Sequence, residues 1–418
     1  MPPACDAPAE RFDPVTGKPL RKVGETVCEE LDSERAQLRV IRHVRPIQGP
    51  SAADGKLRNV PPVMADLPPR PLAGCAASAG LLAWLLVQKF ANHLPLHRQE
   101  AIFGRDGMRI PKQRLCDWTL ASGEALRPIV DRLQQIVCSG PVLQLDDTPV
   151  MCQAGRGEPS FRAYLWTFVH PQVDAVVHRF PAGRGSRLLA DALAGLAGTI
   201  VGDGYSGNPA AADKIGPGIP IGACWTHVTR KLRDAEDEAP NTAKPFPEDI
   251  RQLFAVEREA TDARLDPDGR VRPRRETSRP ILGTILPRSR RVRGQFPDAG
   301  KMAKAMQYGR NRWRALRHFL RHFLRHGLVP IDNHEVERAI RPIAIGRKNW
   351  LFAGSLRGGR AAATIYTLVA SCKRTGIEVL DYLTDVLVRV TTHPASKIDQ
   401  LLPMNWARHF APAAPGLT

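Results

Sequence analysis

Two short apolar runs that each end in an acidic residue constrain the fold of this chain more than any other feature. The run VLQL precedes Asp146 and Asp147, and Thr148-Pro149 is expected to end that strand. The run TIVG precedes Asp203. Because an unpaired carboxylate at the end of a buried strand is costly, acids in both places indicate a functional site rather than a structural role.

A third acid, Glu337, lies on a helix that is predicted to begin at Asp332 or Asn333, either of which can cap it. No Gly or Pro interrupts this helix before Pro342. Spacing of i, i+4 and i+8 places Asn333, Glu337 and Arg341 on one face. The expected buried stripe is Val336, Ala339 and Ile340. A solvated helix face with ion pairs is the plain alternative, but the two acidic strand ends favour a site.

The three acids Asp146, Asp203 and Glu337 could converge on one or two divalent cations. Carboxylate oxygens suit Mg²⁺ or Mn²⁺, and two such ions would activate a nucleophile and stabilise the leaving oxygen in phosphoryl transfer. A carboxylate beside many cations stays ionised, which suits a metal ligand that faces a polyanion. The cations beside Glu337, which would neutralise phosphates near the scissile bond, are Arg338, Arg341, Arg347 and Lys348.

Four blocks in this order, LQLDDTPV, VGDGYSGN, CWTHVTRK and IDNHEVERAIRPIAIGRKNWLFAGS, resemble the DDE transposase encoded by insertion sequence 66. The resemblance runs from about residue 80 to residue 405. It implies a ribonuclease H-like core and Mg²⁺-dependent cleavage and transfer of DNA strands. Asp146 matches the first acid of that family, Asp203 the second and Glu337 the third. Asp147 and Glu335 are the reserve candidates for the first and third.

The third block places His227, Arg230 and Lys231 at the start of a helix, just after a core strand. The resemblance makes His227 a candidate for an active-site or DNA-strand contact. A histidine at a helix start can equally be a cap or a packing residue, and both interpretations stay open. Arg230 and Lys231 are predicted to bind DNA.

The composition agrees with a nucleic-acid partner. The 418 residues include 60 Lys and Arg against 42 Asp and Glu, which gives a net charge of +18. A high-GC genome, which enriches Arg without functional cause, is the competing explanation. No apolar run is long enough for a membrane helix, and no signal peptide is recognisable, so we expect a cytoplasmic, nucleoid-associated bacterial protein without a membrane partner.

The eight cysteines contain no CxxC pair, which favours a reduced state. The related family carries a Cys-rich zinc-binding segment near its N-terminus. Here only Cys5 and Cys28 are found in that region, so four ligands with metal spacing are lacking and no zinc is predicted.

The predicted fold class is α/β: a ribonuclease H-like mixed sheet core with a helical insertion, preceded by a helical region and a small irregular N-terminal segment. The predicted parts are a degenerate zinc-binding-like segment (1–60), a Pro-rich linker (61–78), a helical and possibly DNA-binding region (79–138), the first part of the core (139–236), an insertion (237–330), the last part of the core (331–392) and a C-terminal tail (393–418) that ends loosely.

Within these parts, several local structures are expected. Core strands are predicted at 142–146, 161–169, 174–180, 199–203 and 220–224, and a further strand at 37–44. Two helices are predicted from IPKQRLCDWTLASGEALRPIVDRLQQIV, a pattern compatible with a helix-turn-helix-like unit or with a helical scaffold packed on the core. The Arg-rich stretches of the insertion, DPDGRVRPRRETSRP and PRSRRVRGQ, are expected to be loops that follow the DNA backbone or that are merely solvated.

The sequence thus predicts a transposase that cuts and joins the DNA of a bacterial insertion sequence. Its expected partners are transposon ends, target DNA, a second copy of the chain in a dimer or larger synaptic complex, and small accessory transposition proteins. Two alternatives remain: a ribonuclease H-like nuclease that does not join strands, and a decayed transposase that only binds DNA.

Overall fold

The computed structural model divides into two compact units, Met1–Val44 and Arg45–Thr418. The residues that it describes are Thr16, 38–48, 63–66, 70–155, 157–202, 205, 207–216, 218–223, 225–292, 295–297, 299–311, 316 and 320–410. None of the helices in this part of the chain combines the length and apolar character needed to cross a membrane.

The central sheet has the strand order β5-β4-β3-β6-β7, with a short strand β8 beside the far end of β3. β4 pairs antiparallel with both β3 and β5, whereas β6 pairs parallel with both β3 and β7. This order confirms the predicted ribonuclease H-like mixed sheet. The strands are β3 (Val142–Cys152), β4 (Phe161–Val169), β5 (Val176–Arg179), β6 (Thr199–Gly202), β7 (Ile221–Ala223) and β8 (Phe352–Ala353).

Side-chain alternation along β3 divides the core into two faces. Leu143 and Leu145 pack into the main cluster together with helices α3, α4 and α5. Val142 and Val201 pack instead against α6 and the insertion. The face that carries Val142 therefore also carries the even-numbered positions Gln144 and Asp146. The helices named here are α3 (Lys112–Cys138), α4 (Ser186–Ala192), α5 (Gly207–Ile215) and α6 (Trp225–Arg233).

The strand β3 is longer than predicted, because Thr148-Pro149 does not end it. Pairing with β4 continues to Cys152, and Pro149 lies opposite Tyr164. The other neighbour, β6, leaves β3 at Leu145, so Pro149 occupies a local edge where its missing N–H is tolerated.

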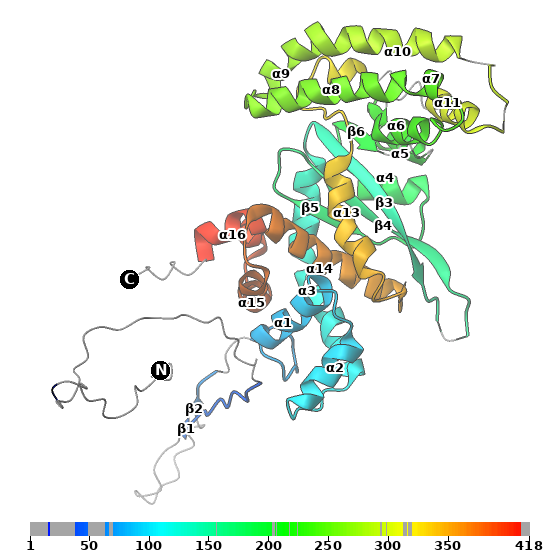
Figure 1. The fold of residues 1–418 in the computed structure, drawn as a ribbon. Helices are drawn as coiled ribbons and strands as arrows, with labels where there is room; N and C mark the ends of the chain where they lie inside the picture. The colour runs from blue at the N-terminus through cyan, green and yellow to red at the C-terminus, as the bar shows by residue number, and fades with distance from the viewer. Residues whose placement is uncertain are drawn as a thin grey trace, which may run out of the picture. The chain divides into compact units, whose positions relative to one another are not determined.

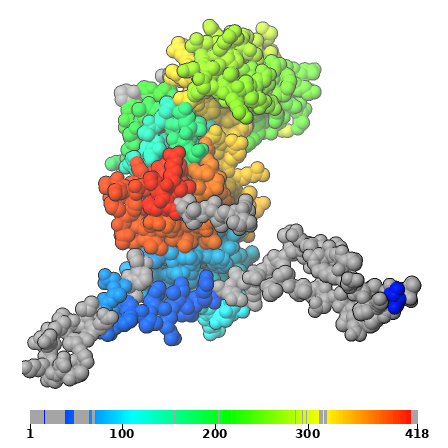
Figure 2. Space-filling view, turned by 90° about the vertical axis from the view of Figure 1, so that its left-hand side faces the viewer, coloured from blue at the N-terminus to red at the C-terminus, as the bar shows by residue number. Residues whose placement is uncertain are grey.

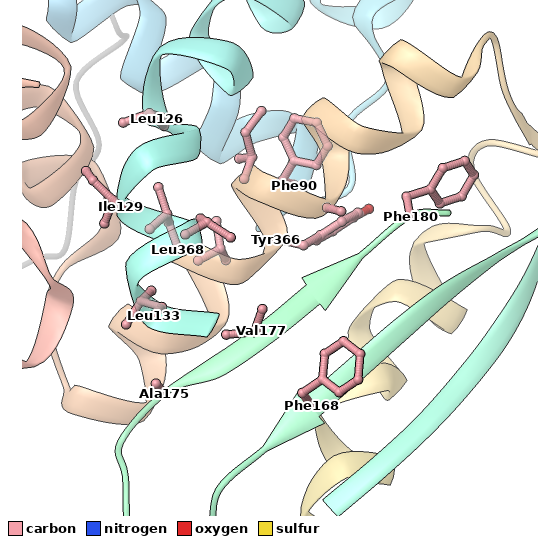
Figure 3. Packing of buried hydrophobic residues seen from close by; sticks show 14 of the residues in the cluster. Phe90, Leu126, Ile129, Leu133, Phe168, Ala175, Val177, Phe180, Tyr366 and Leu368 are labelled. Atoms are coloured by element: carbon pink, nitrogen blue, oxygen red, sulfur yellow. The ribbon is translucent and has the colours of Figure 1, made fainter. Parts of the chain in front are cut away.

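A single helix, α3, replaces the two helices predicted before the sheet. Ser122 and Gly123 are both buried inside this helix. A Cβ at Gly123 would lie 2.6 Å from the Cβ of Ala361 on α14 (Leu356–Thr375), so the glycine permits a close helix crossing instead of a turn. Accordingly no helix-turn-helix forms within α3. Figure 3 shows Leu126 and Leu133 of α3 beside Leu368 of α14.

Two further helices, α1 (Ala79–Phe90) and α2 (Leu96–Arg105), precede α3. Near the start of the chain, Leu38–Val44 forms no strand, contrary to prediction: Val40 and Val44 are 86% and 78% exposed, so their alternation has no core to face. A two-residue strand at Ile47–Gln48 (β1) pairs instead with Val63–Met64 (β2).

The insertion between β7 and the last core segment is helical and has its own hydrophobic cluster. Figure 1 shows α8, α9 and α10 beyond the β6 end of the sheet, away from α1 and α2. The Arg-rich stretches are helical rather than loop-like, and Arg274 is buried in an ion pair with Glu257. The elements are α7 (Pro240–Ala243), α8 (Pro245–Asp262), α9 (Pro267–Pro273), the π-helix η2 (Arg274–Ser278), α10 (Arg279–Arg291) and α11 (Lys301–Asn311).

The chain continues through α13 (His334–Gly346), β8, α14, α15 (Val379–Arg389), the 3₁₀ helix η3 (Ala395–Leu401) and α16 (Pro403–Phe410). Residues 395–410 were expected to be loose, but they pack: Trp406 is buried and its Nε1 donates to Asp385 over 2.8 Å. In Figure 2 these C-terminal helices (orange and red) lie between the N-terminal helices (blue) and the insertion (green).

Candidate active site on the β3–α13 face

The start of α13 is fixed to β3 by side chains of both elements. Gln144, 1% exposed, donates from Nε2 to the carbonyl of Asp332 (3.4 Å) and accepts at Oε1 from the backbone N–H of Val336 (3.2 Å). Asn333 occupies the N-cap position, but its Nδ2 donates to the carbonyl of Leu145 (3.1 Å) and makes no cap bond. The predicted helix start is therefore right, although Asn333 binds the sheet instead of capping the helix.

The buried stripe of α13 follows the predicted spacing. Val336 and Ile340 are buried, and Ala339 is partly buried against the cluster of Val169, Val176 and Val336. This stripe sets the rotation of the helix on the sheet, and with it the direction of the acidic side chains.

Asp146 and Asp147 lie on opposite faces of β3. Asp146 shares its face with Gln144, the face on which α13 docks, and its Oδ1 accepts the backbone N–H of Asp147 over 2.8 Å. The Oδ2 of Asp147 forms an ion pair of 2.6 Å with the Nε of Arg184 on the other face. The structure therefore places Asp146, rather than the reserve Asp147, toward α13.

Glu337 points toward α6, where its Oε1 lies 3.8 Å from the Nδ1 of His227. Within the described part of the chain, this buried Oε1 has no hydrogen-bond partner. The reserve Glu335 points elsewhere and binds Arg374 of α14 over 3.0 Å. A buried carboxylate oxygen without a donor has the chemistry expected of a metal ligand.

The second predicted acid, Asp203, lies outside the described residues. The strand before it is described: β6 ends at Gly202, which pairs with Leu145 of β3. Among the residues that the structure describes, no three His, Cys, Asp or Glu side chains form a cluster that could hold a metal, and Asp203 is not in that set.

The predicted DNA-binding cations lie on α6 and α13. Arg230 and Lys231 of α6 are exposed, as are Arg338, Arg341 and Lys348 on or just after α13. None of these five forms an ion pair with another described residue. Arg347 differs, because its Nη1 donates to the carbonyl of Pro149 and so ties the end of α13 to β3.

Sequence reasoning missed two contributors to this region. Gln144 could have been noticed, because it is a polar residue inside an otherwise apolar strand and lies two positions before an acid. Arg184 carried no such signal, because it precedes α4 and reaches Asp147 only in the folded chain.

Comparisons with known proteins identify the family of the chain. Residues 74–361 match the family described as "Transposase IS66 family", and residues 367–404 match the "IS66 C-terminal element". Two uncharacterized proteins of Sinorhizobium fredii (strain NBRC 101917 / NGR234), y4qI and y4hP, are 33% and 29% identical to the chain. Each match covers 94% of this chain and 73% of the relative. The chain therefore belongs to the IS66 family of DDE transposases.

Proposed function

We propose that this chain cuts and joins DNA as the transposase of a bacterial insertion sequence, with Asp146, Asp203 and Glu337 as its catalytic and metal-binding acids. The observation that carries the proposal is the docking of α13 on β3. Bonds from Gln144 and Asn333 hold the Glu337 helix against the face on which Asp146 lies. Family membership and the net charge of +18 support the same reading.

The residues present fit a divalent metal. Glu337 offers a buried carboxylate oxygen without a hydrogen-bond donor, and Asp146 offers a carboxylate oriented by the N–H of Asp147. Asp203, which directly follows Gly202 in the sequence, is the third proposed ligand. When bound, Mg²⁺ or Mn²⁺, as one or two ions, would supply activation of the attacking hydroxyl and neutralisation of charge at the scissile phosphate.

The chain's own cations would position the DNA. Arg338 and Arg341 project into solvent from the helix that carries Glu337, and Arg230 and Lys231 project from α6 next to His227. Phosphate contacts of this kind fix the register of the duplex without reading its sequence. His227, within 3.8 Å of Glu337, would restrain that carboxylate and contact the strand that enters the site.

Two successive phosphoryl transfers would then suffice. Water attacks the phosphorus at the element's end, the bond to the 3′-oxygen breaks, and a free 3′-hydroxyl remains. That hydroxyl attacks a phosphate of the target, and the bond to the target's own 3′-oxygen breaks. Joining two ends requires both to be held together, so we propose a dimer or larger synaptic complex, assisted by small accessory proteins.

The test is cleavage and joining of DNA that carries the element's terminal repeats, with Mg²⁺, for the wild type beside Asp146→Asn, Asp203→Asn and Glu337→Gln. We expect each variant to lose more than about 100-fold in rate, since even partners of metal ligands cost 10- to 100-fold. Glu335→Gln is the matched control on the same helix and should retain activity. A Glu337→Gln variant that cuts normally would refute the assignment, whereas cutting without joining would identify a nuclease.

A further inference from the structure

On the face of β3 opposite Asp146, Arg184 joins three segments of the chain. Its Nε binds Oδ2 of Asp147 over 2.6 Å, and its guanidinium lies 3.5 Å above the ring of Tyr205. The Tyr205 hydroxyl donates back to the Arg184 carbonyl over 3.2 Å, and the ring of Tyr164 lies 5.4 Å from the guanidinium. Arg184 is thus held by an ion pair and by aromatic contacts at once.

The ion pair is largely shielded from water. The Arg184 and Asp147 side chains are 26% and 12% exposed. A pair of this kind is screened far less than a surface pair, and its geometry is fixed by the surrounding rings.

Both partners of Arg184 lie close in the sequence to proposed metal ligands. Asp147 follows Asp146, and the same Asp147 residue donates its backbone N–H to Oδ1 of Asp146 over 2.8 Å. Fixing the Asp147 side chain therefore fixes the peptide group that orients the Asp146 carboxylate. At the other end, Tyr205 lies two residues after Asp203 in the sequence.

We propose that Arg184, held by its stack on Tyr205, is a positioning residue that fixes Asp147 and so the peptide group that orients the Asp146 carboxylate for metal binding. This inference rests on the proposed function of Asp146. Arg184 touches neither DNA nor metal in this role and acts through Asp147 and Tyr205. Partners of this kind typically change metal affinity 10- to 100-fold when they are lost.

The test measures Mn²⁺ binding to the full chain without DNA, by electron paramagnetic resonance of the free ion, together with the midpoint of thermal unfolding. Arg184→Lys keeps the charge near Asp147 but loses the planar stack on Tyr205, and we expect its Mn²⁺ affinity to fall about tenfold or more. Tyr205→Ala should show the same loss of Mn²⁺ affinity, whereas Tyr205→Phe, which keeps the ring, should bind Mn²⁺ like the wild type. Arg187→Lys, at an exposed position on α4, is the matched control and should bind like the wild type.

The outcomes separate the two proposals. If Arg184→Lys and Tyr205→Ala unfold at lower temperature but bind Mn²⁺ like the wild type, Arg184 is merely structural and this inference is overturned alone. If Asp146→Asn also leaves Mn²⁺ binding unchanged, the metal site itself is wrong, and the proposed function falls with it. The inference is supported if Arg184→Lys and Tyr205→Ala bind Mn²⁺ more weakly than the wild type while Tyr205→Phe binds it equally well.

Discussion

Replacing Gln144 with Leu should detach the start of α13 from the sheet while keeping the volume of the side chain. Gln144 is buried and makes the two hydrogen bonds that link β3 to Asp332 and Val336. Leu fills the same space, so the cavity cost of a Gln→Ala change is avoided. The effect therefore isolates the polar contacts.

The magnitude follows from the two backbone groups that lose their partner. The N–H of Val336 belongs to the first turn of α13 and has no partner within the helix, so leaving it buried and unpaired costs about 1–3 kcal/mol. The bond to the Asp332 carbonyl is long, at 3.4 Å, and contributes less. We expect a loss of about 2–4 kcal/mol in the free energy of unfolding.

The assay is urea denaturation followed by tryptophan fluorescence, with DNA cleavage measured on the same preparation. Cleavage should fall at least about tenfold, because Glu337 follows Val336 directly on the loosened helix turn. Gln113→Leu, at an exposed position on α3, is the control and should stay within about 0.5 kcal/mol of the wild type. A Gln144→Leu protein as stable and as active as the wild type would refute this account of how α13 is placed.

Three further predictions concern stability. Arg274→Ala removes the nearest partner of the Glu257 carboxylate, leaves it only Arg270 at 3.6 Å, and should cost up to about 3–5 kcal/mol in urea denaturation; an unchanged midpoint would contradict a structural role for this arginine. Gly123→Val forces a branched side chain against Ala361 and should cost about 1–3 kcal/mol or more, and a neutral result would show that α3 and α14 can separate freely. Burial lowers the pKa of His178 to about 3, so between pH 6.5 and about 3 this histidine is protonated in the unfolded chain and neutral in the folded chain. Stability should therefore fall as pH drops below about 6.5, by up to about 1.4 kcal/mol per unit, and His178→Gln should flatten that slope; equal slopes would refute the neutral buried histidine.

The sequence predicted those features that depend on local pattern. Short apolar runs predicted the core strands, and helical spacing predicted the rotation of α13 that separates Glu337 from Glu335. In each case a buried face repeats with the period of the element, so local sequence carries the information.

The features that it missed depend on contacts between distant segments. Pro149 was expected to end β3. It is tolerated inside β3 because the pairing of β3 with β6 ends at Leu145, and only the register of the sheet shows this. Two helices were predicted where α3 runs unbroken, and Gly123 within it permits the close approach of Ala361, far away in the chain. Arg274 was predicted to face DNA or solvent, but it is buried against Glu257.

The site itself shows the same division. The strand pattern alone does not separate Asp146 from Asp147, because one residue of register exchanges the faces of a strand, and the preference for Asp146 came from the family resemblance. In the folded chain Asp147 binds Arg184, and Asp146 shares the face of Gln144 and α13, which supports that preference.

The central claim is that Asp146, Asp203 and Glu337 bind one shared metal site. The most direct measurement replaces Mg²⁺ with Fe²⁺ and maps where iron-generated radicals cleave the polypeptide, in the wild type and in Glu337→Gln. The account predicts backbone cuts near residues 146, 203 and 337 in the wild type, all weakened together by that one substitution. Cuts confined to other positions, or cuts that persist unchanged in Glu337→Gln, would contradict it.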